Sequence, residues 1–396
     1  MEELIKLDEY CSSVRDGTHD TPKPTEAGFF LVTSRAVKNN SIDFCSCYYI
    51  SEKDYNKINE RSKVDKWDVL MTMIGTVGRL LLVKDEPEYA IKNMALFKVG
   101  NEDRAKWLYY YLSTSAIQSY FEMIASGTSQ HFIGLGHLRN LKIEDYNHAS
   151  KRITDILSTF DSLIELNNKR VKALEQMAEN LYKEWFVRFR FPGHENAEFE
   201  NGIPKGWKTR RFSSVANILS GGTPKTEYEE YYGGQIPFYT PKDSSENFFV
   251  FDTITKLTED GLRHCNSQLY PQNTIMITAR GTVGNLNLLA VPMAMNQSCY
   301  ALNSDTISSQ YFLFFLIKRE IQKIKKMASG GVFDTIIVNT FDHIKVLLPT
   351  DELINKFDLI VSSIMKEVYS LSKQNINLIK QRDLLLPRLM SGKLEV

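Results

Sequence analysis

Apolar side chains recur every seven residues in two long segments of the chain. In the later segment the row consists of Phe357, Ile364, Leu371, Leu378 and Leu385, which is the a-type spacing of a coiled coil. A shift of 357 − 153 = 204 positions places this row on the earlier one, Ile153, Phe160, Asn167, Leu174 and Leu181. The pattern predicts two long helices, over about 153–190 and 353–390. One stripe alone could pack a helix on its own domain, but two matched stripes favour pairing of the helices with each other.

The remainder of the chain is also repeated. The tetrad Gly-Thr-Val-Gly occurs at 75–78 and at 281–284, which are 281 − 75 = 206 positions apart, and each copy follows a β-prone apolar run. Four more matches keep the same order at offsets of 203 to 207. They pair segments 7–18 with 212–223, 30–35 with 237–242, 93–97 with 296–300, and 125–127 with 328–330. Five matches in one order indicate an internal duplication.

Each repeated segment has the same predicted plan. Short β-prone runs punctuated by Gly and Pro come first, a helical stretch follows over 105–124 or 309–327, and a Gly-containing loop and a last strand close the unit. This order is typical of an α+β domain. We expect domains at 1–147 and 193–349, and spacer helices at 148–192 and 350–396.

The predicted fold is α+β, with two similar domains separated by two long antiparallel coiled-coil helices and related by internal pseudo-twofold symmetry. A helix of roughly 35 residues is about 50 Å long, so the helix pair would hold the domains apart. Asn167 in the apolar row would lower the stability of the pairing and help to fix its register. Duplex DNA repeats every ~34–36 Å, so the predicted separation suits two half-sites about one turn or a little more apart.

Three local motifs and the order of the segments resemble one known family. The motifs are Trp-Phe-Val-Arg-Phe at 185–189, Ile-Pro-Lys-Gly-Trp at 203–207, and Arg-Asp-Leu-Leu-Leu-Pro-Arg-Leu-Met-Ser-Gly-Lys-Leu at 382–394. The chain resembles the DNA-specificity subunit of Type I restriction-modification systems over essentially its whole length. It departs from the family in having no Pro-x-Gly-Trp before the first domain, since it opens at Leu4-Ile5-Lys6-Leu7.

The resemblance implies a function without catalysis. Each target-recognition domain would read one half of a split, asymmetric site in double-stranded DNA, and the helices would set the gap and dock methyltransferase subunits. Two methyltransferase subunits would complete an adenine methyltransferase, and two restriction subunits would add an ATP-dependent nuclease-translocase. The chain itself would bind no cofactor, because S-adenosylmethionine, ATP and Mg are expected on the partner subunits.

Composition narrows this picture. The 48 Lys and Arg balance 48 Asp and Glu, which counts against a lone, non-specific DNA binder unless positive charge is shared with basic partners or confined to one face. The sequence has no apolar run of about 18 residues, and its acidic N-terminus does not resemble a secretory signal. Its five cysteines form no CxxC pair, and Cys45 and Cys47 have no matching Cys or His nearby. Reduced thiols in a cytoplasmic protein are therefore expected, and no metal site.

Motifs of catalysis are missing from the sequence. It has no GxxxxGK[ST] loop and no Asn-Pro-Pro-aromatic tetrad, and Pro241-Lys242-Asp243 lacks a second acid at a usable spacing. A self-sufficient nuclease-methyltransferase is the first alternative, and activity of the purified chain on DNA would favour it. A purely structural coiled-coil protein is the second alternative, and a failure to bind DNA even with partners would favour it.

Base reading requires paired donors and acceptors on loops that can enter a groove, while small polar side chains position phosphates. The candidates in the first domain are Thr18, His19, Thr33, Arg35, Thr76, Arg79, Gln130 and His131. Those in the second are Thr223, Tyr239, Thr240, Lys242, Arg280, Thr282 and Asn285. The arginines and Lys242 could instead be ordinary surface charges, and the repeated glycines could serve the backbone alone. Positions that differ between the repeats, such as Arg79 and Asn285, are better base-reading candidates than shared ones.

Overall fold

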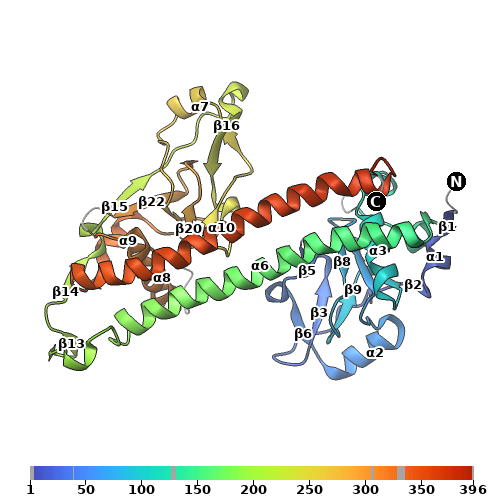
Figure 1. The fold of residues 1–396 in the computed structure, drawn as a ribbon, viewed down its shortest axis with the longest axis horizontal. Coiled ribbons are helices and arrows are strands. Elements are labelled where there is room, and N and C mark those ends of the chain that lie inside the picture. Colours follow the sequence, from blue (N-terminus) through green and yellow to red (C-terminus); the bar gives the residue numbers. More distant parts are fainter. Residues whose placement is uncertain (1–3, 39, 126–130, 305–306, 328–334, 395–396) are drawn as a thin grey trace. The chain divides into compact units, whose positions relative to one another are not determined.

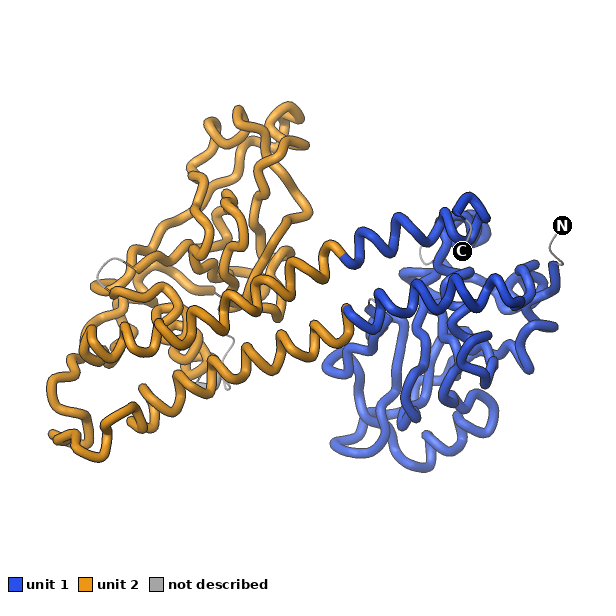
Figure 2. Tube along the Cα trace, in the orientation of Figure 1, with its two compact units in different colours: residues 1–163, 378–396 blue, residues 164–377 orange. Residues whose placement is uncertain are grey.

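The computed structural model describes residues 4–38, 40–125, 131–304, 307–327 and 335–394. The chain divides into two compact units, residues 1–163 with 378–396 and residues 164–377 (Figure 2). Each unit contains one of the predicted α+β repeats together with a part of each long helix. The limits of the units, at 163/164 and 377/378, fall inside the long helices and differ from the expected domain boundaries. Those boundaries stay a prediction.

Unit 1 is built around a four-stranded antiparallel sheet in the order β2-β10-β7-β8 (Figure 1). Its strands are β2 (Ser13–Asp16), β7 (Val69–Thr72), β8 (Leu80–Leu82) and β10 (Met94–Lys98). A second sheet, β6-β3-β9, consists of β3 (Phe29–Thr33), β6 (Tyr48–Ile50) and β9 (Tyr89–Lys92), and in it β3 and β9 run parallel. Two small pairs complete the unit, β1 (Leu4–Lys6) with β11 (Lys142–Glu144) and β4 (Val37–Lys38) with β5 (Ser41–Ile42).

Both faces of the central sheet are covered, which explains why β7 is apolar throughout. Side chains alternate across a strand, so Val69 and Met71 pack in a core with Trp107, whereas Leu70 packs on the other face with Val32. The first face is covered by α3 (Glu102–Leu112) and α4 (Ser115–Ile124), and the second by the smaller sheet. The sequence predicted one helical stretch over 105–124; the structure interrupts it at Ser113 and Thr114.

Unit 2 repeats this topology and adds a fifth strand, β17, which pairs parallel with β20 at the edge of the main sheet. Its main sheet has the order β15-β22-β19-β20-β17, and its smaller sheet the order β18-β16-β21 with β16 and β21 parallel. The main-sheet strands are β15 (Ala216–Ser220), β17 (Phe249–Val250), β19 (Ile275–Thr278), β20 (Leu286–Leu289) and β22 (Cys299–Ser304). The others are β12 (Phe199–Glu200), β13 (Ile203–Pro204), β14 (Lys208–Arg211), β16 (Tyr232–Tyr239), β18 (Lys256–Leu257), β21 (Ala294–Met295) and β23 (Lys345–Leu348). The α+β class and the predicted duplication are confirmed.

The core of unit 2 follows the same rule. Ile275 and Ile277 face a core that includes Phe312 of α8 (Gln310–Met327), whereas Met276 packs on the opposite face. The short helices of the two units are α1 (Leu7–Tyr10), α2 (Glu52–Ser62), α5 (Leu135–Arg139), α7 (Glu259–Arg263) and α9 (Val338–His343).

The two long helices are α6 (His148–Phe186) and α10 (Asp351–Met390), and they are paired antiparallel. In unit 2, Asn167 contacts Asn375 and Phe186 contacts Phe357. Residue numbers therefore increase along α6 in the direction in which they decrease along α10, as in an antiparallel pair. In unit 1, Asp161 contacts Arg382. The side chain of Asn147 caps the start of α6 by accepting a hydrogen bond from Ser150 N at 2.9 Å.

The predicted heptad rows form part of this pairing. In α10, Phe357, Ile364 and Leu371 are buried, while Leu378 and Leu385 are half-buried. In α6, Ile153 and Asn167 are buried, while Phe160, Leu174 and Leu181 are half-buried. A second row that the sequence analysis did not single out is buried as well: Leu157, Val171, Ala178 and Trp185 in α6, and Ile354, Val361, Val368, Asn375 and Leu389 in α10.

Candidate nucleic-acid interface

The candidate residues of unit 1 lie at one edge of its central sheet. Strands β2 and β7 end there and β10 begins there, because Asp16 pairs with Ala95 and Thr72 pairs with Met94. The smaller sheet joins at the same place, since Thr18 N donates to Ile91 O of β9 at 3.0 Å. We define the first loop edge as the loops 17–25, 34–37, 73–79 and 131–134.

Hydrogen bonds connect these loops to one another. Gly75 N donates to His131 O at 3.0 Å, and Arg79 Nη1 donates to Val37 O at 3.1 Å. The His19 side chain links two further residues of this edge, Asn93 and Asp16. One ring nitrogen lies 2.8 Å from Asn93 Oδ1 and the other 2.8 Å from Asp16 Oδ2. His19, Arg35, Thr76, Arg79 and His131 are exposed, and Thr18 and Thr33 are half-buried. Gln130 lies outside the described residues.

The Gly-Thr-Val-Gly turn between β7 and β8 is held by a buried hydroxyl. Thr72 is fully buried, and its Oγ1 donates to Thr76 O while it accepts a hydrogen bond from Arg79 N at 3.0 Å. Gly75 and Gly78 have φ values of 80° and 82°, which L side chains rarely adopt. A Cβ on Gly78 would also lie 2.8 Å from Gln118 Oε1. Both glycines therefore meet a requirement of the backbone.

Unit 2 contains the same turn between β19 and β20. Thr278 Oγ1 donates to Thr282 O and accepts a hydrogen bond from Asn285 N at 3.0 Å, as Thr72 does in unit 1. Gly281 and Gly284 have φ values of 78° and 75°. The turn thus has the same backbone design in both units, with its polar groups satisfied by one buried threonine.

The candidates of unit 2 also gather at the matching edge. Asn285 Nδ2 donates to Ser244 Oγ at 3.2 Å, and that hydroxyl lies 3.2 Å from Thr282 Oγ1. Thr240 Oγ1 donates to Asp243 Oδ2 at 2.6 Å, which orders the 3₁₀ turn Pro241–Asp243 that carries Lys242. We define the second loop edge as the loops 221–225, 240–245, 279–285 and 296–298. Thr223, Lys242, Arg280 and Thr282 are exposed there, and Thr240 and Asn285 are half-buried.

Tyr239 is placed differently from its neighbours. Its side chain is 0% exposed, and its hydroxyl donates to Asn287 Oδ1 at 2.8 Å inside the core between the two sheets. Burial raises the pKa of this phenol well above its ordinary value. Tyr239 therefore offers no surface to a ligand and supports the loop that begins at Thr240.

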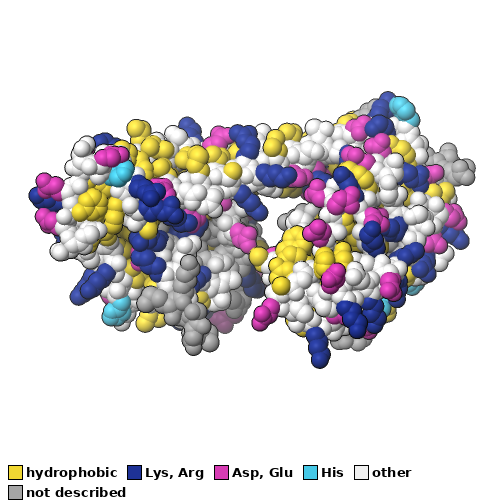
Figure 3. Space-filling view, turned by 90° about the horizontal axis from the view of Figure 1, so that it is seen from below, with side chains coloured by type: hydrophobic (Ala, Val, Ile, Leu, Met, Phe, Trp, Pro, Cys, Tyr) yellow, Lys and Arg dark blue, Asp and Glu magenta, His cyan; other side chains and the backbone are white. Residues whose placement is uncertain are grey.

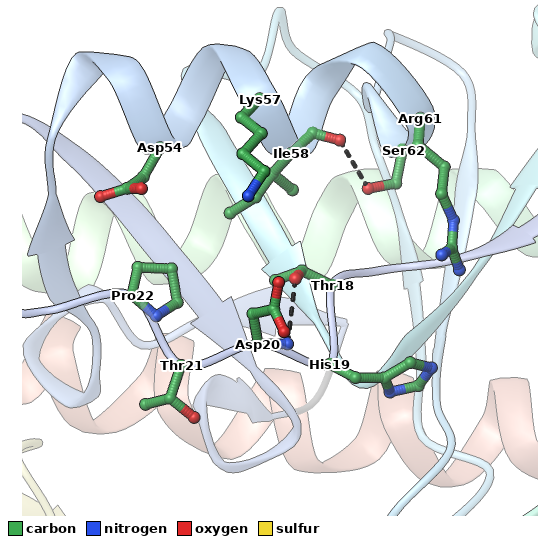
Figure 4. Close-up of a pocket in the computed structure, with 10 residues that line it drawn as sticks. All are labelled: Thr18, His19, Asp20, Thr21, Pro22, Asp54, Lys57, Ile58, Arg61 and Ser62. Atoms are coloured by element: carbon green, nitrogen blue, oxygen red, sulfur yellow. Dashed lines mark hydrogen bonds between the residues drawn. The ribbon is translucent and has the colours of Figure 1, made fainter.

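A pocket of about 460 Å³ opens beside the first loop edge, between residues 18–22 and α2 (Figure 4). Thr18, His19 and Asp20 line one side of it, and Lys57 and Arg61 line the other. Arg61 pairs with Asp16, which also contacts His19. The pocket is therefore lined by both acidic and basic groups.

Charges of both signs are mixed in the same way over the surface. Figure 3 shows Lys and Arg side chains interspersed with Asp and Glu over each unit on the face drawn. This agrees with the formal net charge of zero. At the loop edges, positive charge therefore comes from individual residues such as Arg35 and Lys242.

Among the described residues, no group of three or more His, Cys, Asp or Glu could hold a metal ion. None of the described helices combines the length and apolar character that a membrane crossing requires.

Several residues that organise the loop edges were missed by the sequence analysis. Asn93 has φ 55° and holds His19, and Gln297 accepts a hydrogen bond from Thr223 Oγ1. Ser244 bridges two loops of unit 2. Asn93 and Asn296 are matched positions of the repeat, so comparing the repeats for shared polar residues could have found the first of these.

Comparisons with known proteins agree with the duplication. The model of the Type I restriction modification DNA specificity domain matches residues 3–176 and again residues 204–381. The chain is 26% identical to the type I restriction enzyme HindI specificity subunit of Haemophilus influenzae, over 92% of this chain and 94% of that one. It is 24% identical to the MjaIX specificity subunit of Methanocaldococcus jannaschii, over 95% of this chain and 86% of that one.

The fold is also similar to that of a solved structure. The crystal structure of the Type I restriction-modification S subunit from M. genitalium matches with a TM-score of 0.57 at 16% identity, covering 98% of this chain and 96% of that chain. The family model matches most of the chain, once in each repeat. The chain belongs to the family of Type I restriction-modification specificity subunits, which are non-catalytic and give DNA specificity to a methyltransferase and endonuclease complex.

Proposed function

We propose that each loop edge reads one half of a bipartite, asymmetric site in double-stranded DNA. The observation that carries this proposal is the gathering of the candidate side chains of each repeat on connected loops at one edge of the main sheet. Loops on a rigid scaffold are where proteins place binding residues. The two edges share a backbone design but differ in several exposed side chains, as two readers of different half-sites would.

The proposed contacts divide by chemistry. Arg35, Arg79, Lys242 and Arg280 would bind phosphates or guanine edges, because each is exposed and carries several donors. The smaller polar residues Thr18, Thr33, Thr76, Thr223, Thr240 and Thr282 suit phosphate positioning. His19, Gln130, His131 and Asn285 complete the proposed set. Tyr239 acts from within the core and is not included among the contacts.

The long helices would set the gap between the half-sites and dock two methyltransferase subunits. Large apolar side chains are exposed on them, with Leu166 54%, Met177 51% and Leu359 76% exposed in unit 2. A methyltransferase subunit docked on the helices would remove the apolar surface of these side chains from water. The complete complex would add two restriction subunits in the cytoplasm, with S-adenosylmethionine, ATP and Mg bound by the partner subunits.

The test is to co-express the chain with its methyltransferase subunit and sequence the host DNA for methyladenine. Methylation at one split motif, made of two short half-sites with a fixed gap, is the expected result. A failure to form any complex with the methyltransferase subunit would contradict the proposal.

A second arm separates specificity from catalysis. The purified chain alone, supplied with S-adenosylmethionine or magnesium, should leave the same DNA unmodified and uncut. Activity of the chain alone would favour a self-sufficient enzyme instead.

A further inference from the structure

The Gly-Thr-Val-Gly turn is the same in both units at its centre and different at both flanks. Ile74 precedes it and Arg79 follows it in unit 1, whereas Arg280 precedes it and Asn285 follows it in unit 2. The four central residues are needed for the conformation of the turn. Two are glycines with positive φ, and a carbonyl between them accepts a hydrogen bond from the buried threonine. Any difference in what the two turns recognise therefore falls on the flanking side chains.

The position after the turn is fixed by the β-hairpin. Arg79 is bound to Thr72 in both directions, because Arg79 N donates to Thr72 Oγ1 at 3.0 Å and Thr72 N donates to Arg79 O at 2.9 Å. Asn285 N donates to Thr278 Oγ1 at 3.0 Å, and Thr278 N donates to Asn285 O at 3.0 Å. A side chain that starts from so rigid a backbone is held in the way that selective recognition requires.

Both side chains keep donors for a ligand. Arg79 uses Nη1 for Val37 O, which is one of the five N–H donors of a guanidinium, and the side chain is exposed. Asn285 uses Nδ2 for Ser244 Oγ, and an amide group has a second N–H and a carbonyl oxygen. A guanidinium binds guanine O6 and N7 with two donors, whereas an amide binds adenine N6 and N7 with one acceptor and one donor.

We propose that the residue after the turn selects a base in each half-site, with Arg79 reading a guanine and Asn285 reading an adenine. This inference rests on the proposed function, since it assumes that each loop edge meets one half-site. On this proposal, the position at which the repeats differ recognises the base, and the positions that the repeats share stabilise the turn.

The experiment compares methylated motifs of complexes that contain the wild-type chain, Arg79→Asn or Asn285→Arg. Arg79→Asn should change one base pair of one half-site from G·C to A·T and leave the other half-site and the gap unchanged. Asn285→Arg should change the other half-site in the opposite sense. On the original site, each variant should lose about 5- to 150-fold in methylation efficiency, the range for loss of one bidentate base contact.

Matched controls lie at the opposite end of the same strands. Lys66 and Gln272 are exposed residues that precede β7 and β19, whereas the turns follow these strands. Lys66→Asn and Gln272→Arg repeat the two charge changes there and should leave the motif and its methylation efficiency unchanged. If Arg79→Asn does not assemble, Arg79→Lys keeps the charge without the planar fork, and it should weaken the preference for G·C.

The outcomes separate this inference from the function on which it rests. If the wild type methylates a split motif and Arg79→Asn methylates the same motif equally well, the inference is overturned and the proposed function stands. If Arg79→Asn weakens methylation equally at all variants of the site, Arg79 binds phosphate and base reading is overturned. If the wild-type complex forms and methylates no split motif, the proposed function itself fails.

Discussion

Asn167 on α6 and Asn375 on α10 face each other across the helix pair of unit 2. Asn167 Nδ2 donates to Asn375 Oδ1 at 3.0 Å, and the two residues are 5% and 6% exposed. Asn375 Nδ2 donates in turn to Asn168 Oδ1 at 2.8 Å. A slide of one helix would place these amides against the apolar side chains of Val171 or Val368, where they would lose their partners. The amide pair thus opposes other registers of the helices.

Substitution of one member of this pair should cost more than substitution of both. Asn375→Leu places an apolar group against the buried Asn167, which keeps its bond to Gln374 Oε1 at 2.9 Å, and should lower the free energy of unfolding by about 1 kcal/mol. Asn167→Leu/Asn375→Leu removes both buried amides, and the partners left behind, Asn168 and Gln374, are exposed to water. Its stability in urea should lie above that of Asn375→Leu. A double variant less stable than the single variant would contradict the amide pairing.

The ion pair between Asp161 and Arg382 ties α6 to α10 in unit 1. Arg382 Nη1 donates to Asp161 Oδ1 at 2.6 Å, Tyr110 donates to Asp161 Oδ2 at 2.6 Å, and the two charged side chains are 12% and 24% exposed. Arg382→Met should destabilise the protein by about 1–3 kcal/mol, because it leaves a largely buried carboxylate without its cation. Arg152→Met, an exposed arginine on α6, is the control. Equal midpoints of denaturation for both variants would contradict the assignment.

Two buried threonines of unit 2 should respond in opposite ways to the same substitution. Thr278 and Thr274 are both 0% exposed, but Thr278 Oγ1 holds the turn while Thr274 Oγ1 has no hydrogen-bond partner among the described residues. Thr278→Val should cost about 1 kcal/mol, since Asn285 N and Thr282 O lose their bonds to Thr278 Oγ1 and keep only the 3.2 Å bond to each other. Thr274→Val should be neutral or stabilising, because a buried hydroxyl without a partner is unfavourable. Thermal denaturation of both variants tests the contrast, and equal losses would refute it.

Glu175 gives unit 2 a stability that depends on pH. Burial raises the pKa of its carboxyl above the ordinary value of 4.5, against the opposing effects of Phe248 N–H and Lys318. A raised pKa means that the folded state favours the protonated acid, so this contribution is complete below pH 4.5 and is lost as the pH rises through the folded-state pKa. Glu175→Gln keeps an acceptor for Phe248 N and carries no charge. It should therefore be more stable than the wild type at pH 7.

The difference in melting temperature should shrink as the pH falls toward 4.5. Glu246→Gln removes an exposed charge from the same unit and serves as the control for net charge. A gain for Glu175→Gln that is equally large at low and neutral pH would show that its origin is not the buried charge.

The sequence was sufficient for the repeated fold because its strongest signals are local. The Gly-Thr-Val-Gly tetrads mark turns that need positive φ, and the seven-residue rows mark helices. The second row of the helix pair was not evident, because the polar residues Asn375 and Arg382 interrupt its apolar pattern. The break between α3 and α4 was missed because helical periodicity continues through Ser113 and Thr114, while the Gln118 amide, bonded to Leu112 O and Gly78 O, orders the break.

The candidate site was less predictable because its contacts join distant residues. Arg79 meets the Val37 carbonyl, 42 positions away, and Asn285 meets Ser244, 41 positions away. No local pattern encodes such contacts. Tyr239 and Phe238 are neighbours on β16, and both are buried. They pack in two different cores, because both faces of β16 are covered. Alternation along one strand does not reveal that both of its faces are covered.

The contact between Asp161 and Arg382 also bears on how the protein is made. Unit 2 is a continuous stretch, residues 164–377, whereas unit 1 combines residues up to 163 with residues from 378 onward. A nascent chain could therefore assemble the later unit while the earlier one still waits for the end of α10, residues 378–390. During that interval, residues such as Ile153 and Leu157, which share a core with Leu389, remain uncovered. Until synthesis passes Leu389, this apolar surface would be a target for chaperones and proteases, so chains interrupted before that point would be selectively removed.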